Sequence, residues 1–510
     1  MAQPDVVVVG AGSAGCVLAA RLSEDPTRTV LLIEAGGPPN DPRLLDPLQW
    51  PFLGDAPYDW GYHTVPQPHA AGRSFHWPRG RLVGGTSQLH AMGHVRGHPA
   101  DFEVWAAATA DEGWSYEHLL PYFMRSESFS EGASDHHGGD GPMTVWLPPQ
   151  LHPVAEAYLR AVQEVGHPWI GEHNGPAGMQ GAARNSLMIR DGHRVSAAAA
   201  YLDPVRDRPN LEVVTDAVVD RVLMDGDRAI GVTADVAGEG RRIMAGEVVL
   251  AAGSIASPLI LMRSGIGAPD DLSPHGIACR HELPAVGGNL HDHMLAAGNV
   301  YRARRPVASS QLQHSESLLY VNEAGEAAPD IVITCVLLPA VSECFTAPEP
   351  GSAYTIFFGV CHPRSRGRIT LGGAGPLDQP VIDPAYLSDA DDRDRFRAAL
   401  RLARRVGHAG AMDEWRAEEL LPGSAVERDD DLDAFISRAA ITHHHPVGTC
   451  AMGRDATTSV VDGALCVHGL DGLRIVDSSV IPAITTGPVH AAVLALAERG
   501  ADLIVGRTEG

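Results

Sequence analysis

The chain has 510 residues, of which 44% are apolar and 20% charged, and a formal net charge of -24. This length allows two or three domains with a substantial core. The negative charge argues against partners such as nucleic acid or anionic membrane surfaces, and no apolar run approaches the roughly 20 residues of a membrane-spanning helix. The seven cysteines are scattered, without a CxxC pair, and no leader-like segment precedes the first strand, so we expect a cytoplasmic protein with reduced thiols.

The N-terminal segment has the pattern of a βαβ unit. Val6–Val9 predicts a buried strand, Cys16–Ser23 a helix, and Thr29–Ile33 a second strand that ends at Glu34. A glycine-rich turn separates the first strand from the helix. This order of elements is typical of dinucleotide-binding domains.

The turn, GAGSAG at residues 10–15, matches the GxGxxG pattern. Gly10 permits the tight turn, Gly12 lets the backbone approach a pyrophosphate, and Gly15 lets helix and strand pack closely. The N–H groups at the helix start would face the phosphates. Glu34 can accept hydrogen bonds from a ribose 2′-hydroxyl, so the segment predicts a dinucleotide site.

The middle of the chain is less regular. Ser126–Pro142 predicts a surface loop, and its His136 and His137 lack a third ligand at metal-binding spacing, so we interpret them as solvated. Leu211–Val236 predicts strands around a Gly-Asp turn, and Val248–Gly253 predicts another buried strand. Further strands are expected at Asp330–Leu337 and Ala353–Val360, and helices at Asp391–Val406 and His490–Ile504.

Several later segments carry further motifs, at Gly80–His90, Gly253–Pro258, Ser264–Gly267, Gly288–His293, His445–Thr449 and Asp477–Pro482. With the βαβ unit, they resemble the signatures of the glucose–methanol–choline (GMC) oxidoreductases from end to end. The resemblance implies an α/β FAD-binding Rossmann-like domain interleaved with an α+β substrate-binding domain that contains an antiparallel sheet. We assign residues 1–293 to the FAD-binding N-terminal region and 294–440 to the substrate-binding domain. Residues 441–510 would form a C-terminal segment that carries the catalytic histidines and completes the FAD domain.

The resemblance implies FAD as cofactor and places its contacts by position. Those at the ADP half are Gly10, Gly12, Gly15, Glu34 and the backbone of Val219. Those nearer the flavin, the pyrophosphate and the ribityl chain are Trp60, Gly84, Thr86, Ser87, His90, His444, Asp477 and Ser478. Members that bind FAD covalently carry the linking histidine one residue before His90, where this chain has Leu89, so we expect non-covalent FAD.

Alcohol oxidation removes a proton from the hydroxyl and a hydride from the carbon. A neutral histidine suits the first task, and the flavin accepts the hydride. By resemblance His445 is the catalytic base, and His490, eight residues after Pro482, is the second active-site residue. We therefore predict an oxidase or dehydrogenase that acts on a small-molecule alcohol, with O2 or another electron acceptor.

Three alternatives accompany this prediction. The same scaffold and histidines could serve an FAD-containing hydroxynitrile lyase. In such an enzyme, the substrate would not bleach the flavin. The N-terminal motif alone would also suit an NAD-linked dehydrogenase or a non-catalytic nucleotide binder, although the later motifs have no role there. A divalent metal on the run His443–His445 is disfavoured, because adjacent residues rarely point the same way. His443 itself departs from the small apolar residue common in oxygen-reactive relatives.

Overall fold

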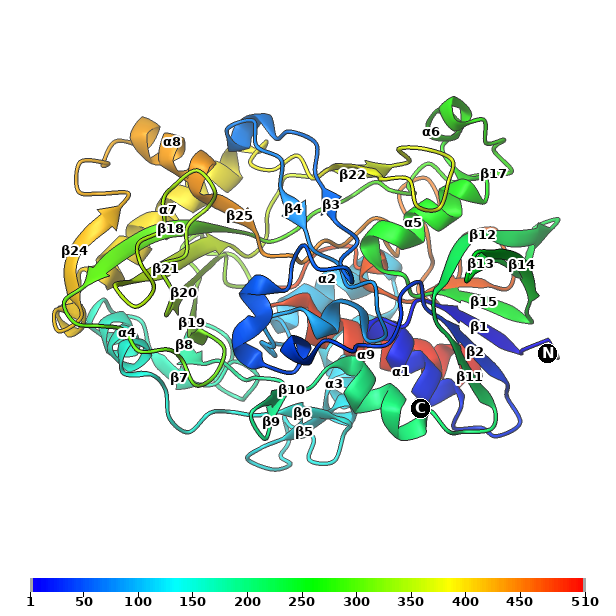
Figure 1. The fold of residues 1–510 in the computed structure, drawn as a ribbon, viewed down its shortest axis with the longest axis horizontal. Coiled ribbons are helices and arrows are strands. Elements are labelled where there is room, and N and C mark those ends of the chain that lie inside the picture. The colour runs from blue at the N-terminus through cyan, green and yellow to red at the C-terminus, as the bar shows by residue number, and fades with distance from the viewer. Residues whose placement is uncertain (1–2, 508–510) are drawn as a thin grey trace.

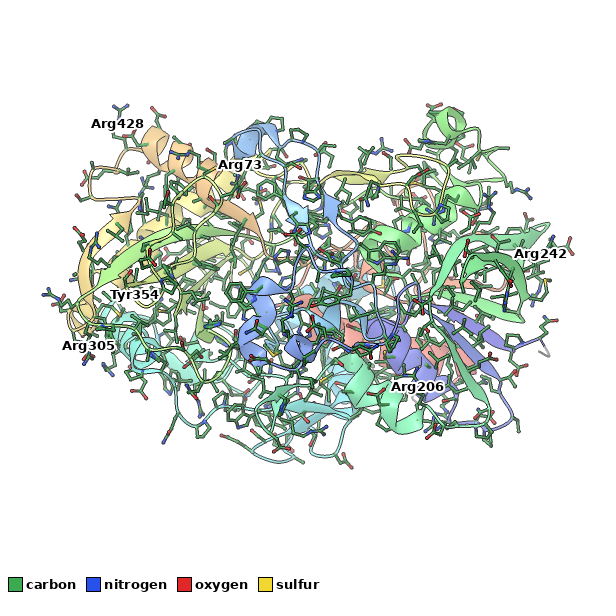
Figure 2. The ribbon with its side chains drawn as sticks, in the orientation of Figure 1. Arg73, Arg206, Arg242, Arg305, Tyr354 and Arg428 are labelled. Carbon is green, nitrogen blue, oxygen red and sulfur yellow. The ribbon has the colours of Figure 1, made fainter. Side chains whose placement is uncertain are left out.

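The computed structural model describes residues 3–507. Its two large sheets lie toward opposite ends of the long axis, with loops and short helices between them (Figure 1). In Figure 2, Arg305 and Arg428 mark the outer rim of one end, and Arg242 marks the other. Among the described residues, no helix has the length and apolar character needed to cross a membrane.

The first sheet is parallel and forms the core of the dinucleotide-binding fold. Its strand order is β11 (Leu211–Val214), β2 (Val30–Ile33), β1 (Val6–Val9), β15 (Glu247–Leu250) and β26 (Leu473–Ile475). The central strands are apolar and buried along their whole length, as expected of a parallel sheet covered on both faces. Segments more than 400 residues apart in the chain therefore build one sheet.

Helix α1 (Ser13–Leu22) follows β1 and packs against the C-terminal helix α9 (Val489–Val505). The prediction that the first helix starts at Cys16 was wrong by one turn, because Gly12 is the N-cap and the glycine turn itself enters the helix. Helix α9 is buried on most of its surface rather than along one face. An ion pair between the partly exposed Arg21 and the buried Glu498 joins the two helices at 2.8 Å.

The second sheet has eight strands, and only the β7–β8 pair is parallel. The order is β24 (Arg416–Leu421), β18 (Met294–Ala303), β21 (Ala353–Val360), β20 (Ile331–Val336), β19 (Ser315–Val321), β8 (Gly181–Arg184) and β7 (Trp169–Gly171), with β25 (Ala440–Thr442) beside β18. Three helices pack on it: α4 (Pro153–Glu164), α7 (Ala390–Gly407) and α8 (Asp429–Ala439). The expected antiparallel sheet is therefore present. Strands β7 and β8 join it from before residue 294, and β25 crosses the expected boundary at residue 440. The division into three segments stays a prediction.

A smaller antiparallel sheet adjoins the parallel one. It consists of β12 (Ala217–Asp225), β13 (Arg228–Val236) and β14 (Glu239–Met244). The first two strands were expected, whereas β14 is polar and exposed and carries no apolar pattern. The other α-helices of the described residues are α2 (Pro99–Thr109), α3 (Tyr116–Ser126), α5 (Gly253–Arg263) and α6 (Pro269–Leu272). Short strands also pair two by two: β3 (Tyr62–His63) with β4 (His76–Trp77), β5 (Glu127–Phe129) with β6 (Met143–Val145), β9 (Ile189–Arg190) with β10 (His193–Arg194), β16 (Ile266–Gly267) with β17 (His281–Glu282), and β22 (Arg368–Thr370) with β23 (Val381–Asp383).

The interpretation of Ser126–Pro142 as a solvated loop was wrong for His137. This side chain is buried, and its two ring nitrogens lie 2.9 Å from Glu127 and 3.0 Å from Glu172. Burial alone would lower the pKa of His137, but the two carboxylates raise it to about 9. The histidine is therefore a buried ion-pairing group that holds the loop down.

Candidate active site

A single cavity of about 800 Å³ is lined by residues from both large sheets, within the size range of ligand pockets. It brings together most of the positions that the sequence singled out. Those that line it are Gly10, Gly12, Glu34, Trp60, Thr86, Ser87, His90, Val219, His444, His445, Asp477, Ser478 and His490. The cavity also contacts β-strand residues of the second sheet, so a long ligand could span both domains.

At one end of the cavity, two glycine turns cross closely. A Cβ on Gly10 would lie 2.6 Å from the carbonyl oxygen of Ala251, and a Cβ on Gly85 would lie 2.7 Å from the Cα of Gly12. Gly12 itself lines the cavity and is the N-cap of helix α1, which has no side-chain cap hydrogen bond. The first N–H groups of α1 are therefore accessible to an anionic group, as a pyrophosphate site requires.

Two predicted cofactor contacts do not line the cavity. A Cβ on Gly15 would lie 1.8 Å from the carbonyl oxygen of Gly10, so this glycine serves the packing of the turn on the helix. Gly84 has φ +96° and precedes the turn that Gly85 and Thr86 form at the cavity wall. Both glycines shape the site through the backbone of their neighbours.

Glu34 lies at the end of β2, buried at the cavity wall. Its carboxylate accepts hydrogen bonds from the backbone N–H groups of Ala11 and Gly36, each at 2.9 Å. Burial raises the pKa of Glu34 to about 7, against the lowering effect of these bonds. Besides facing the cavity, Glu34 therefore ties the glycine turn to the loop after β2.

Other predicted contacts also hold segments together. Asp477 accepts hydrogen bonds from the N–H of Gly253 at 2.9 Å and the hydroxyl of Ser257 at 2.6 Å, which joins the end of β26 to the start of α5. The Ser87 hydroxyl donates to the carbonyl of Gly84 at 2.6 Å and accepts from the N–H of Ala197 at 2.9 Å. These hydrogen bonds hold the segments of the cavity wall together. A ligand would contact the neighbouring backbone groups.

Val219 adjoins an irregularity in a strand, whereas Trp60 is held by contacts of its aromatic ring. Val219 lies in β12 just before a bulge, where the pairing with β13 shifts by one residue. Bulges interrupt a ladder and often adjoin functional sites, which suits a backbone contact. The Trp60 ring stacks on Tyr62 at 5.8 Å, and the Arg81 guanidinium lies 5.0 Å from its centre.

The reacting end of the cavity contains two groups of histidines. In the first, the rings of His90 and His490 meet edge to face, with centroids 4.7 Å apart. The Nδ1 atom of His90 accepts a hydrogen bond from the N–H of Met92 at 3.2 Å, so its Nε2 carries the hydrogen. Within residues 3–507, that Nε2 and both ring nitrogens of His490 are buried without a partner.

The second group centres on His445, in the segment after β25. Its Nδ1 lies 3.0 Å from the Nδ1 of His293, whose Nε2 lies 2.8 Å from the carbonyl oxygen of Cys361. Because a carbonyl only accepts, the hydrogen of His293 is on Nε2 and its Nδ1 is an acceptor. His445 must then donate from Nδ1, which leaves the lone pair of its Nε2 available.

The backbone around His445 is held by a buried carboxylate. Asp292 accepts the N–H of His445 at 2.6 Å and the hydroxyl of Thr442 at 2.6 Å, and the Tyr386 hydroxyl also donates to it. His444 adopts φ +64°. This turn separates His444 from its neighbours, so that the rings of His443 and His445 lie on one side with centroids 4.4 Å apart.

Burial keeps these histidines neutral. It lowers the pKa of His443, His444 and His490 to about 3, and it lowers the pKa of His445 well below its ordinary value, with further lowering by the neighbouring histidines. A neutral imidazole with a free nitrogen is the form that accepts a proton. The site can therefore deprotonate a hydroxyl at neutral pH.

The residues present fit FAD. A long cavity connects an uncapped helix N-terminus and a carboxylate at one end to buried, unpartnered histidine nitrogens at the other. The first end matches an ADP group, and the second would surround a flavin and a substrate. Nicotinamide chemistry would leave the later glycine turn and the histidines without a role.

Comparison with known proteins agrees with this geometry. The GMC oxidoreductase family models match residues 4–295 and 363–497. The chain belongs to the GMC oxidoreductase family. It is 51% identical to a pyridoxine 4-oxidase of Microbacterium luteolum over 98% of this chain and 99% of that protein, and 38% identical to the mitochondrial choline dehydrogenase of Mus musculus over 98% of this chain and 89% of that protein. The crystal structure of pyridoxine 4-oxidase from Mesorbium loti superposes with a TM-score of 0.96 and 46% identity, covering 99% of this chain and all of that one.

The GMC protein described here is thus an FAD-dependent enzyme that oxidises alcohols, which favours the main prediction over the lyase and NAD-linked alternatives. The sequence motifs predicted no roles for Asp292 and His293, although both lie in the motif Gly288–His293. Their partner His445 is more than 150 residues away in the chain. The only available signal was that the segment carries two histidines around an aspartate.

Proposed function

We propose that this GMC enzyme oxidises the hydroxymethyl group of a substituted pyridine of the pyridoxine type. The support is the 51% identity to a pyridoxine 4-oxidase, against 38% to a choline dehydrogenase, together with a TM-score of 0.96 to a second pyridoxine 4-oxidase. Apolar side chains of the second sheet, among them Leu295, Val336 and Phe357, line part of the cavity. An aromatic ring can pack against them.

The base in this proposal is His445. Its Nε2 takes the proton of the substrate hydroxyl, because Nδ1 is committed to His293 and burial keeps the ring neutral. The Nε2 atom of His90 and the two ring nitrogens of His490, which lack partners among the described residues, hold the flavin and the substrate oxygen by hydrogen bonds. Bound FAD supplies the hydride acceptor.

The remaining assignments belong to the same proposal. The cofactor contacts are those predicted from the sequence, with Gly15 and Gly84 acting through their neighbours. FAD is held non-covalently, O2 accepts the electrons, and the protein works in the cytoplasm. The oxygen assignment is supported by the 51% identity to a protein named as an oxidase, the pyridoxine 4-oxidase of Microbacterium luteolum.

The deciding experiment is anaerobic reduction of the purified, FAD-loaded enzyme. Pyridoxine should bleach the oxidised flavin band, and choline at equal concentration should not. The His445→Ala variant should retain FAD and slow bleaching by about 10²- to 10⁴-fold, the usual contribution of a positioned base. Bleaching by choline alone would reject the substrate assignment, and an undiminished rate in His445→Ala would reject the base.

A further inference from the structure

We propose that the histidines around the catalytic base form a reversible inhibitory site for a zinc ion, with His293, His443 and His445 as ligands. One nitrogen from each ring can be chosen such that all three lie within 4.8 Å of one another. His293 comes from the start of β18 and the other two from the segment after β25. The sheet pairing of β25 with β18 brings them together.

The spacing of the rings is close to what zinc requires. Two nitrogens bound to a tetrahedral zinc ion at about 2.0–2.1 Å lie about 3.3 Å apart. The Nδ1 atoms of His293 and His445 are 3.0 Å apart, so a small rotation of either ring admits the ion between them. The ring centroids of His443 and His445 are 4.4 Å apart, and those of His293 and His443 are 6.3 Å apart. The His443 ring therefore lies beside this pair and can supply the third nitrogen.

The free nitrogens of the rings also suit a metal. In the described part of the chain, neither ring nitrogen of His443 has a hydrogen-bond partner. His293 keeps its Nε2–H on the carbonyl of Cys361, the kind of outer contact that orients a metal-bound histidine through its other nitrogen.

Three imidazole nitrogens match the donor set of an accessible zinc site. His443 and His445 line the cavity, so an ion held by them would lie at the wall of the space that the substrate hydroxyl must enter. Binding at Nδ1 of His445 would move the hydrogen of that ring to Nε2 and so remove the lone pair that accepts the substrate proton. Binding at Nε2 would occupy the lone pair directly. In either mode zinc excludes the alcohol from the base.

The chain also offers a matched control site. Asp55, Asp59 and His76 form a second cluster of potential ligands, of which Asp55 and His76 line the cavity. Here the Nε2 of His76 is already paired with Asp59 at 2.8 Å, and Asp55 is largely exposed. Zinc that binds there would not touch His445, so substitutions at the two clusters separate the alternatives.

The test uses the FAD-loaded enzyme, freed of metals by chelator and titrated with ZnCl2 by calorimetry in a non-coordinating buffer. We expect about one zinc ion per chain, and no heat with MgCl2, because Mg²⁺ prefers oxygen ligands. His443→Gln should weaken zinc binding by more than about 100-fold, since losing even an outer partner of a ligand costs about 10- to 100-fold. His76→Gln should leave zinc binding unchanged. His293→Gln should also weaken zinc binding. FAD content and melting temperature show whether each variant is folded. If His293→Gln does not fold, the result for His443→Gln decides the test.

Inhibition is measured separately. Zinc should slow anaerobic bleaching competitively with the alcohol in wild type and His76→Gln, but not at the same concentration in His443→Gln. The inhibition arm rests on the proposed function, whereas calorimetry does not. If pyridoxine fails to bleach the flavin, the proposed function fails, but the number of zinc ions bound per chain still tests the zinc site. Zinc binding that survives His443→Gln, or that is lost in His76→Gln, would overturn the site.

Discussion

The Nδ1 atoms of His293 and His445 lie 3.0 Å apart, and the opposite nitrogen of His293 lies 2.8 Å from the carbonyl of Cys361. This chain of contacts permits only one arrangement of hydrogens when both rings are neutral. His445 presents its bare nitrogen to the cavity. His293 is therefore a positioning residue, which sets the tautomer and the orientation of the base through one hydrogen bond.

Removing that bond should reduce catalysis without removing the base. His293→Leu should slow anaerobic flavin reduction on the order of 10²-fold, because the His445 ring loses the acceptor that fixes its tautomer. His293→Gln should recover part of the rate, since its amide oxygen can accept the same hydrogen. Rapid-mixing absorbance of the flavin, at saturating alcohol, measures both rates.

The comparison of the two variants separates positioning from packing. A merely structural role predicts that both variants lose melting temperature and activity in parallel. Equal rates in His293→Leu and His293→Gln, with FAD retained in both, would contradict the hydrogen-bond argument.

The pH dependence of kcat/KM should show the effect of burial on the base. Burial lowers the pKa of His445 well below 6.5, so the neutral form that accepts the proton persists as the pH falls through 6.5. Activity should then decline only at more acidic pH, with a midpoint below that of free histidine. Initial rates at low alcohol concentration across the acid range give this midpoint. A midpoint at or above 6.5 would mean that the ring is as solvated as in a peptide.

The sequence predicted those parts of the fold whose pattern is local. The strand Val6–Val9 and the strand Ala353–Val360 were correct to the residue, because continuous apolar runs bounded by turns leave little freedom. Strand β14 was missed because its side chains are polar and exposed, and its pairing depends on β13. Local pattern carries no information on such a strand.

The candidate site was predictable only through its motifs. The turn at residues 10–15 and the position of His445 follow from signatures, but the contacts among histidines arise from the pairing of β18 with β25. The same limit explains the error at His137, whose ring contacts Glu172, 35 residues further along the chain. A pattern of residues along the chain does not show which carboxylate will meet a histidine across the fold.

Glu34 should affect both the cofactor and the fold. Glu34→Ala leaves the N–H groups of Ala11 and Gly36 without their acceptor, and each unsatisfied buried group costs about 1–3 kcal/mol. We therefore expect weaker FAD binding and also a lower free energy of unfolding of the FAD-free protein. Fluorescence titration with FAD and urea unfolding measure the two effects. Asp216→Asn, on the adjacent loop beside Gly37, is a matched control that keeps both Glu34 bonds. An unaltered FAD affinity in Glu34→Ala would remove this residue from the cofactor site.

The last prediction concerns how FAD is held beside His90. The Nδ1 of His90 accepts the N–H of Met92, and Nη1 of Arg194 lies 3.2 Å from the same atom. Two donors on Nδ1 keep the hydrogen on the buried, unpartnered Nε2, which makes that nitrogen a hydrogen-bond donor and a poor nucleophile. Denaturation with acid should therefore release all the yellow colour into the supernatant, where absorbance and mass identify unmodified FAD.

His90→Ala should lower FAD affinity by the loss of one hydrogen bond, about 0.5–1.5 kcal/mol, and His90→Asn should restore part of it, because an amide N–H can donate from this position. Colour that precipitates with wild-type protein but not with His90→Ala would establish a covalent link and contradict the tautomer deduced from these contacts.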